Sequence, residues 1–144
     1  MQDLLLQYGL YGLFALSFLA ATVLPVASEA GLVALILAGA DPVACVATAT
    51  LGNTLGAMTT WAVGRWGSDA FLTRLLGLSA AQRERAERIF ARYGAWSLLL
   101  AWAPVIGDPL CAVAGLFGLP LGRFVPPVLV GKLFRYAGLA CFVN

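Results

Sequence analysis

Two long stretches without a charged side chain constrain the fold of this chain more than any other feature. Residues 4–28 form one uncharged stretch of 25 residues, and residues 42–64 form another of 23. A helix of about 20 apolar residues crosses the hydrocarbon core of a bilayer. Only 11% of the 144 residues are charged, whereas a soluble domain carries about 25%. The sequence therefore predicts an all-α integral membrane protein with a single domain.

Several chemical functions are disfavoured by composition. The sequence contains no histidine, so the usual catalytic base and zinc ligand is missing. The three cysteines lie in apolar surroundings without the spacing of a metal or redox site, and we expect them to be small core residues: Cys45, Cys111 and Cys141. We expect no enzyme, no metal or other cofactor, and no nucleic-acid partner. No basic residue precedes the first apolar stretch, so we do not expect a cleavable signal.

One polar segment, residues 65–93, divides the chain. It holds three acidic residues and six arginines, namely Arg65, Arg74, Arg83, Arg85, Arg88 and Arg92. Loops rich in arginine and lysine tend to face the cytoplasm, which predicts a cytoplasmic location for this segment. Its arginines could bind anionic lipid headgroups, or could serve only solvation and orientation, and the sequence leaves both interpretations open.

The second half of this segment has the pattern of an amphipathic helix. Ser79 and Gln82 match a capping box, and Gly94 suits a helix end. Residues at spacings of three and four form an apolar face: Ala86, Ile89, Phe90 and Tyr93. The polar side carries two acid–base combinations four residues apart, Arg83 with Glu87 and Glu84 with Arg88. We expect this helix to lie on the inner membrane surface.

The segments on either side of the polar loop share a pattern. A displacement of 79 positions aligns Pro25 with Pro104, Glu29 with Asp108, Gly39 with Gly118, and Gly52 with Gly131. This suggests a duplicated unit, with residues 1–64 as the first repeat and residues 94–144 as the second. Each repeat has a half-length apolar stretch ending in proline, an acid four residues later, a second half-length stretch and a longer segment.

The half-length stretches predict hairpins that enter the membrane without crossing it. In the second repeat, residues 93–107 and 109–122 are uncharged apart from their junction at Asp108, and neither is long enough to span a bilayer. The helix breakers at the two hairpin tips are Pro25, Pro104, Gly107 and Pro109. If each repeat has one hairpin and one crossing, the repeats are inverted and the tips meet near the midplane. This topology places the N-terminus outside.

Four charged residues fall within the predicted membrane segments: Glu29, Asp108, Lys132 and Arg135. Charge at the bilayer centre costs about 2.5–3.5 kcal/mol for Asp, Lys or Arg, so such residues usually face the interior and pair with one another. Lys132 and Arg135 are three residues apart and share a helix face. One interpretation is a set of salt bridges that fixes packing. Because buried pairs contribute little net stability, we favour a proton- or headgroup-binding site.

Small residues recur every four positions in the longer segment of the first repeat: Thr48, Gly52, Gly56, Thr60 and Gly64. Such a face allows helices in lipid to approach closely. The sequence does not decide whether it packs within the chain or against a second copy in a homo-oligomer. Asn53 is a candidate polar residue lining the site.

Several motifs together resemble the YqaA branch of the bacterial DedA family, also called VTT or SNARE-associated membrane proteins. They are LPVASE (residues 24–29), TLGNTLG (50–56), GRW (64–66), RYG (92–94), PVIGDPLCAVAG (104–115) and GKLFRY (131–136). The resemblance covers nearly the whole chain. It implies a multi-pass protein of the bacterial inner membrane, with two facing re-entrant hairpins. It also implies lipid translocation, because relatives are linked to the movement of undecaprenyl phosphate and phospholipids.

By position, the resemblance assigns Glu29 to the acid of the first hairpin and Arg135 to a required membrane arginine. The wider family has an Arg-Phe-x-Pro-x-x-Arg pattern in its second hairpin. Residues 101–107 here read AWAPVIG, so both arginines of that pattern are missing. A phosphate would then have to be held by Lys132, Arg135 and Arg65.

The leading hypothesis from the sequence is a transporter of a lipid or lipid phosphate, proton-linked through Glu29 and Asp108. A second is a non-transporting membrane protein that supports membrane homeostasis or the assembly of other proteins. A third, an intramembrane aspartyl protease, is suggested by the Gly107–Asp108 dipeptide. That chemistry needs a pair of aspartates, and the partner acid here would be Glu29, so we disfavour it.

Overall fold

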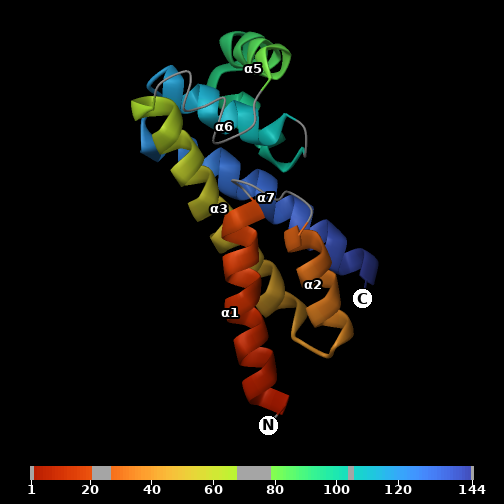
Figure 1. Ribbon diagram of the computed structural model, residues 1–144. Coiled ribbons are helices and arrows are strands. Elements are labelled where there is room, and N and C mark those ends of the chain that lie inside the picture. Colours follow the sequence, from red (N-terminus) through yellow and green to blue (C-terminus); the bar gives the residue numbers. More distant parts are fainter. Residues whose placement is uncertain (1, 21–26, 68–78, 104–105, 144) are drawn as a thin grey trace.

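The computed structural model describes residues 2–20, 27–67, 79–103 and 106–143. Within these ranges the regular elements are all helical (Figure 1): α1 (Gln2–Ala20), α2 (Ala27–Leu37), α3 (Pro42–Trp66), α5 (Ala80–Tyr93), the 3₁₀ helix η1 (Gly94–Trp102), α6 (Gly107–Leu116) and α7 (Leu121–Val143). The predicted all-α class is confirmed. Pro25, Pro104 and Arg74 lie outside the described residues.

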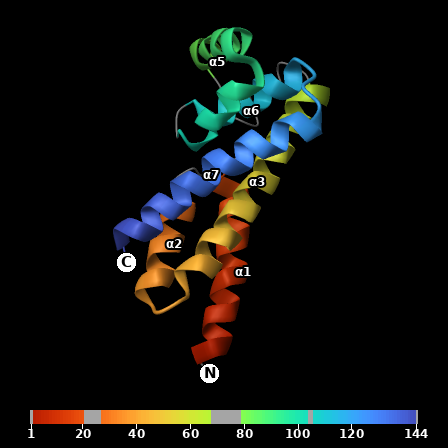
Figure 2. The same ribbon diagram turned by 180° about the vertical axis from the view of Figure 1, so that it is seen from behind.

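The two longest helices, α3 and α7, cross side by side at the centre of the fold (Figure 2). The contacts between them run in opposite directions along the two helices. The side chain of Asn53 contacts that of Lys132, and eight residues further along α3 the ring of Trp61 lies 6.1 Å from that of Phe124, eight residues earlier in α7. The helices are therefore antiparallel, and this register fixes which residues of each helix can meet.

The same hydrogen-bonded turn ends α2 and α6. The amides of residues 38, 39 and 40 donate to the carbonyls of residues 34, 36 and 35, and those of residues 117, 118 and 119 donate to residues 113, 115 and 114. Gly39 and Gly118 have φ angles of 99° and 74°, which a residue with a Cβ adopts only at a cost. The displacement of 79 positions that aligns the sequences also aligns these turns and the starts of α3 and α7.

The remaining helices pack on the central pair in a regular way. In the first half of the chain α1 and α2 precede the long helix α3, and in the second half η1 and α6 precede α7; we call α1 and η1 the first arms and α2 and α6 the second arms. α1 lies against α3 and η1 lies against α7, so each first arm contacts the long helix of its own half. α2 reaches α7 and α6 reaches α3, so both second arms contact the long helix of the other half. The first arms differ in form, because α1 is an α-helix of 19 residues and η1 a 3₁₀ helix of nine.

The small-residue face of α3 packs within the chain. A Cβ on Gly64 would overlap the carbonyl oxygen of Ala112 in α6, and one on Gly115 would overlap that of Trp61. A Cβ on Gly52 would lie 2.6 Å from the carbonyl oxygen of Phe14 in α1. The predicted packing role of this face is confirmed: Gly52 allows α1 to approach α3 closely, and Gly64 allows α6 to do so.

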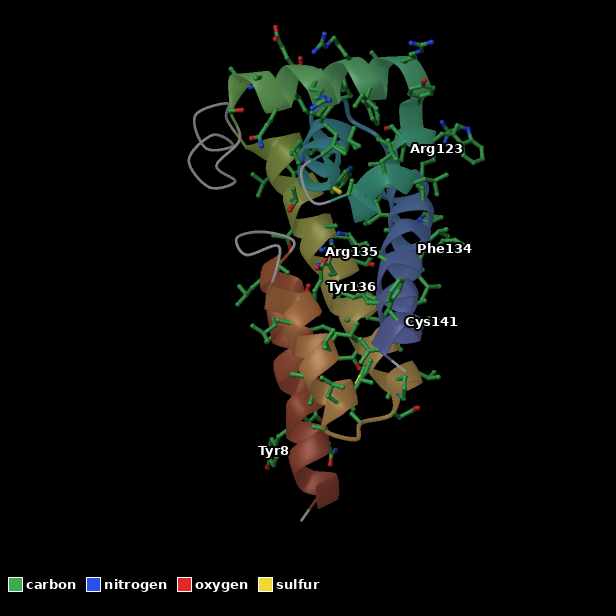
Figure 3. The ribbon with its side chains drawn as sticks, turned by 90° about the vertical axis from the view of Figure 1, so that its right-hand side faces the viewer. Tyr8, Arg123, Phe134, Arg135, Tyr136 and Cys141 are labelled. Carbon is green, nitrogen blue, oxygen red and sulfur yellow. The ribbon has the colours of Figure 1, made fainter. Side chains whose placement is uncertain are left out.

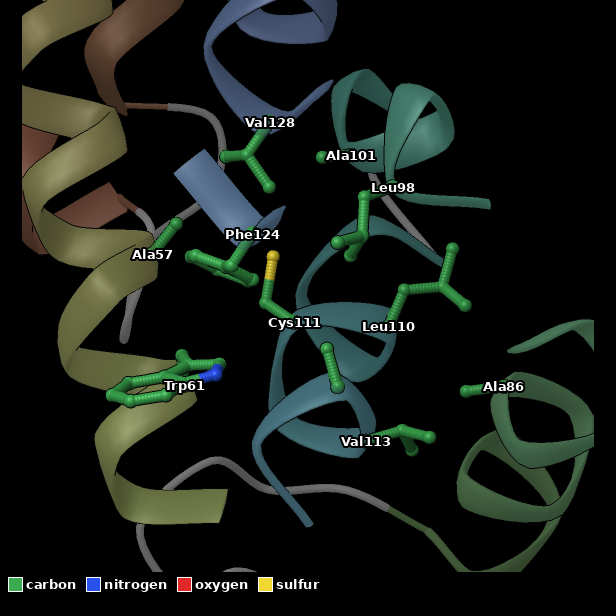
Figure 4. Packing of buried hydrophobic residues seen from close by; sticks show 11 residues of the cluster. Ala57, Trp61, Ala86, Leu98, Ala101, Leu110, Cys111, Val113, Phe124 and Val128 are labelled. Carbon is green, nitrogen blue, oxygen red and sulfur yellow. The ribbon is translucent and has the colours of Figure 1, made fainter. Parts of the chain in front are cut away.

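Two apolar clusters fill the fold. One joins α3, α5, η1, α6 and α7 around Cys111 and Phe124 (Figure 4). The other joins α1, α2, α3 and α7 around Cys45. Two cysteines are thus core residues as predicted, but the prediction was wrong for Cys141, which is exposed. Cys141 falls on the outer side of α7, where apolar sequence surroundings do not imply burial.

The amphipathic helix is confirmed as α5. Ser79 and Gln82 form the capping box and Gly94 caps the C-terminus. Ala86 is buried, and Phe90 stacks on Phe117 of the α6 end at a centroid distance of 5.4 Å. The helix thereby covers one end of the bundle.

Two details of α5 differ from the prediction. Tyr93 is 54% exposed although it shares the apolar face, because it is the last residue of the helix and lies past the packed turns. Arg83 and Glu87 form an ion pair at 3.1 Å, but the described side chains of Glu84 and Arg88 form none. Ion pairs between exposed side chains contribute little, so residue spacing alone does not ensure that they form.

The outer faces of the long helices are apolar in their middle turns, where the charged side chains of Lys132 and Arg135 point inward, while Arg65 and Arg123 near the helix ends are exposed. Val43, Leu55, Phe134 and Phe142 are exposed, an arrangement suited to lipid as the surrounding solvent. Among the helices of the described residues, α7 alone is both long and apolar enough to cross a membrane. α3, predicted as the other crossing over residues 42–64, has 25 residues and reaches about 37 Å at 1.5 Å per residue, but its threonines, glycines and Asn53 lower its hydropathy.

Candidate functional site

A buried lysine lies at the middle of the bundle. Lys132 occupies the central turns of α7 and is 1% exposed. Its Nζ donates a hydrogen bond to Oδ1 of Asn53, which lies at the middle of α3. The Nδ2 of Asn53 in turn donates to the backbone carbonyl of Ser17 in α1 at 3.0 Å. One amide side chain therefore connects α1, α3 and α7.

An ion pair lies one turn further along α7. Nη2 of Arg135 contacts Oε1 of Glu29, and the two side chains are 13% and 33% exposed. Glu29 is in the first turn of α2, where the positive end of the helix dipole favours a carboxylate. Figure 3 shows Arg135 and Tyr136 on the side of α7 that faces the bundle, and Phe134 on its outer side. The pair therefore holds the second arm of the first half against α7.

Tyr136 strengthens the same contact between α2 and α7. Its hydroxyl lies 2.8 Å from Oγ of Ser28, and both residues are fully buried. The guanidinium of Arg135 lies 5.8 Å from the centroid of the Tyr136 ring, a distance at which the ring attracts a cation. Two consecutive residues of α2 thus bind two consecutive residues of α7.

The two cations differ in charge balance. The charge of Arg135 is matched by Glu29, whereas the contact of Lys132 is with a neutral amide. No carboxylate of the described residues forms an ion pair with Lys132. A buried charge is costly unless it is paired, so an anion or a polar ligand would stabilise Lys132.

The structure gathers some of the predicted site residues and separates others. Glu29, Asn53, Lys132 and Arg135 lie along the contact of α7 with α2 and α3. Arg65 does not join them. It is exposed in the last turn of α3, with its guanidinium 5.8 Å from the Trp61 ring, and the twelve residues that separate it from Asn53 correspond to about 18 Å along a helix.

The segment predicted as the second hairpin is described only in part. α6 begins at Gly107, and Asp108 belongs to its first turn, but the Asp108 side chain lies outside the described residues. A Cβ on Gly107 would overlap the carbonyl oxygen of Ala101 in η1, so the two arms approach closely. Pro109, predicted as a breaker, instead lies within the first turn of α6, where a missing amide proton costs no helical hydrogen bond.

The sequence interpretation missed three polar residues of this centre. Ser17, Ser28 and Tyr136 are buried beside the predicted residues. Tyr136 lies four positions after Lys132 and Ser28 directly precedes Glu29. Position on the same helix turn as a membrane-embedded charge was therefore an available signal.

A separate basic hollow of about 300 Å³ lies on the flank of α5. It is lined by Arg85, Arg88, Ile89, Arg92 and Tyr93. The guanidinium of Arg92 lies 5.5 Å from the centroid of the Tyr93 ring. Its position at one end of the bundle is compatible with both interpretations of the arginine-rich face.

Comparisons with known proteins agree with the membrane assignment. The VTT domain model matches residues 24–144. The inner membrane protein YqaA of Escherichia coli is 42% identical over 133 residues, covering 92% of this chain and 89% of that protein. An uncharacterized protein of Haemophilus influenzae is 38% identical over 135 residues, covering 88% of this chain and 82% of the relative. No solved structure gives a significant match. The chain is therefore an inner-membrane protein of the DedA family, to which the VTT domain belongs.

Proposed function

We propose that this protein moves a lipid or lipid phosphate, such as a polyprenyl phosphate or a phospholipid, across the inner membrane, and that the movement is linked to protons. The observation that carries the proposal is Lys132, a cation buried midway along the membrane-spanning candidate α7, which donates to a neutral amide and forms an ion pair with no carboxylate of the described residues. Ionisable residues inside membrane segments are expensive and usually mark substrate or ion pathways. A phosphate oxygen is a suitable counter-charge for this ammonium group.

The proposed architecture is an inverted repeat. Residues 1–64 and 94–144 form the two repeats, each with a re-entrant hairpin and a long helix, and residues 65–93 form a cytoplasmic amphipathic segment. The antiparallel α3 and α7 and the equivalent turns after α2 and α6 support this arrangement. Asn53 and Lys132 are also 79 positions apart, so equivalent positions of the two repeats touch. Contact between equivalent positions is expected at a two-fold axis.

Glu29 and Arg135 provide a way to link protons to binding. When a proton adds to the carboxylate of Glu29, the side chain becomes neutral and its attraction for Arg135 falls. The guanidinium can then bind a phosphate oxygen, for which its planar donors are suited. Loss of the proton restores the ion pair and displaces the phosphate. Asp108, at the equivalent position of the second repeat, is the second candidate proton site.

A non-transporting role in membrane homeostasis or assembly is the second candidate. The Glu29–Arg135 contact favours it, because an ion pair that joins α2 to α7 can serve packing alone. This alternative predicts that neutral variants lose abundance or stability and nothing else.

Lipid movement in proteoliposomes separates these functions. A fluorescent polyprenyl phosphate and a fluorescent phospholipid are followed across a range of pH with native protein and the variants Glu29→Gln, Asp108→Asn and Arg135→Gln, at matched incorporation. Arg123→Gln is the control, since Arg123 is exposed near the start of the same helix. We expect native protein and the control to move one of the lipids with a rate that depends on pH, and the other variants to be folded but slow.

Two results would reject the transport proposal. The first is a native protein that moves neither lipid at any pH, and the second is a native rate in all three variants. If the variants instead fail to fold while native protein is inactive, the structural role takes precedence.

A further inference from the structure

Three buried hydroxyls of α1 and α3 have no hydrogen-bond partner within the described part of the chain. They are those of Ser17, Thr50 and Thr54, which are 0%, 3% and 4% exposed. Buried polar groups in proteins are nearly always hydrogen-bonded to protein or to ordered water. A helical threonine commonly donates to the carbonyl four residues earlier, as Thr60 does to Gly56 at 3.3 Å. The two threonine hydroxyls therefore point to a ligand.

Two of these hydroxyls, those of Thr50 and Thr54, lie on one side of α3 beside Asn53. Thr50 lies three residues before Asn53 and four before Thr54, so its side chain is a neighbour of both on the surface of α3. Because α3 and α7 are antiparallel with Asn53 opposite Lys132, Thr50 lies at the level of Arg135. The Ser17 hydroxyl is separate from these two, because its Cβ would lie 3.1 Å from a Cβ built on Gly52, which is two residues from each threonine and faces away from both.

We propose that Thr50, Thr54 and Lys132 bind a small cluster of water molecules between α3 and α7. Water donates and accepts, and a buried water needs two to four polar partners. Each hydroxyl can do both, and the ammonium group of Lys132 has three protons to donate, of which Asn53 accepts one. The cluster hydrates the buried charge, which no described carboxylate matches.

The water cluster extends toward the ion pair, because Thr50 is level with Arg135. A hydrogen-bonded chain of water can accept a proton at one end and pass another to the carboxylate of Glu29 at the other, with no water consumed. This second step rests on the proposed proton-linked transport, whereas the presence of water does not.

The accessibility of introduced cysteines tests the water site directly. In a background with Cys45→Ala, Cys111→Ala and Cys141→Ala, single substitutions Thr50→Cys and Thr54→Cys are compared with Thr60→Cys. Thr60 is an equally buried control on the same helix whose hydroxyl is already bonded to the backbone. A water-soluble methanethiosulfonate reagent reacts only with the thiolate, which forms more readily in contact with water than in apolar surroundings. If water reaches positions 50 and 54, we therefore expect cysteines there to be modified about tenfold faster, or more, than the cysteine of Thr60→Cys. Rates as low as that of Thr60→Cys would overturn the proposal.

A shape-matched substitution gives a second test. Valine replaces the threonine hydroxyl with a methyl group, so Thr50→Val and Thr54→Val remove only the polar atom. If water binds there, both variants melt at a lower temperature than native protein, as Thr60→Val does through loss of its backbone bond. If the site is dry, both variants melt at the native temperature or above it, and the proposal is overturned.

The two proposals can fail independently. Reactive cysteines at positions 50 and 54 in a protein that moves no lipid support the water site and reject transport. Lipid movement by a native protein whose introduced cysteines react no faster than the control rejects the water site and leaves transport standing.

Discussion

Two cations three residues apart on α7 meet different surroundings. Arg135 contacts a carboxylate on α2, and Lys132 contacts an amide on α3. From the sequence they are a matched pair on one helix face, equally suited to hold a phosphate. The structure separates their surroundings, because the Arg135 ion pair joins α2 to α7, whereas Lys132 pairs with no carboxylate of the described residues. Position on a face therefore does not determine function when the facing helices differ.

The chemistry of each side chain suits its place. The guanidinium of Arg135 can bind a carboxylate and also lie over a ring, and it has Glu29 and Tyr136 as neighbours. The ammonium of Lys132 is a compact charge that water or an oxyanion can surround. Exchanging the two residues would therefore not be neutral at either position.

Breaking the ion pair should have the largest effect on stability. Arg135→Gln leaves the carboxylate of Glu29 without its cation, and removal of one partner of a fully buried pair costs about 3–5 kcal/mol. Because the Glu29 side chain is 33% exposed, we expect a smaller loss of about 2 kcal/mol. Denaturant unfolding in detergent measures it, with Arg123→Gln as the control. A loss no greater than that of the control would contradict the proposed role of the pair.

Removing both partners should restore part of that loss. Contacting residues show interaction free energies of about 0.5–3 kcal/mol in double-mutant cycles. We therefore expect the double variant Glu29→Gln with Arg135→Gln to lose less stability than the two single losses added together, by about 1 kcal/mol or more. The cycle uses the same unfolding measurement. Additive losses would mean that the two side chains do not interact in the folded protein.

The hydroxyl contact beside the pair should contribute less. Tyr136→Phe removes the 2.8 Å hydrogen bond to Ser28 and leaves one buried hydroxyl behind, which predicts a loss of about 1 kcal/mol. Ser28→Ala removes the same bond from the other side. If this bond is the source of the loss, the double variant is hardly less stable than either single variant.

The smallest change in stability is expected at the other cation. Lys132→Met keeps the length of the side chain and removes a buried charge that no described carboxylate matches, while Asn53 loses a donor. These effects oppose each other, so we expect stability to stay within about 1 kcal/mol of the native value. A loss as large as that of Arg135→Gln would remove the distinction between the two cations.

The local features of the fold could be predicted from the sequence. The capping box of Ser79 and Gln82 and the glycines at 39 and 118 act through neighbouring residues, so their patterns are visible in the chain. The displacement of 79 positions aligned Gly39 with Gly118, and the structure places these two glycines in equivalent turns. Exposure of Cys141 could not be predicted, because it depends on which side of α7 the other helices cover.

The partners within the site were harder to predict for the same reason. Charge alone made Arg65 a candidate, but its place in the last turn of α3 separates it from the centre. The contact of Asn53 with Lys132 depends on how α3 crosses α7. Their separation of 79 positions is the repeat displacement itself, so the sequence held a signal for this contact that the alignment of the halves did not use.

The most direct test of this account is the rate of lipid movement by Lys132→Met in proteoliposomes, beside native protein at equal incorporation. We predict a variant that is as stable as native protein and moves the labelled lipid phosphate much more slowly, because the charge at the centre serves the substrate and not the fold. A folded variant with the native rate would contradict the account and would leave Lys132 as a residue of packing.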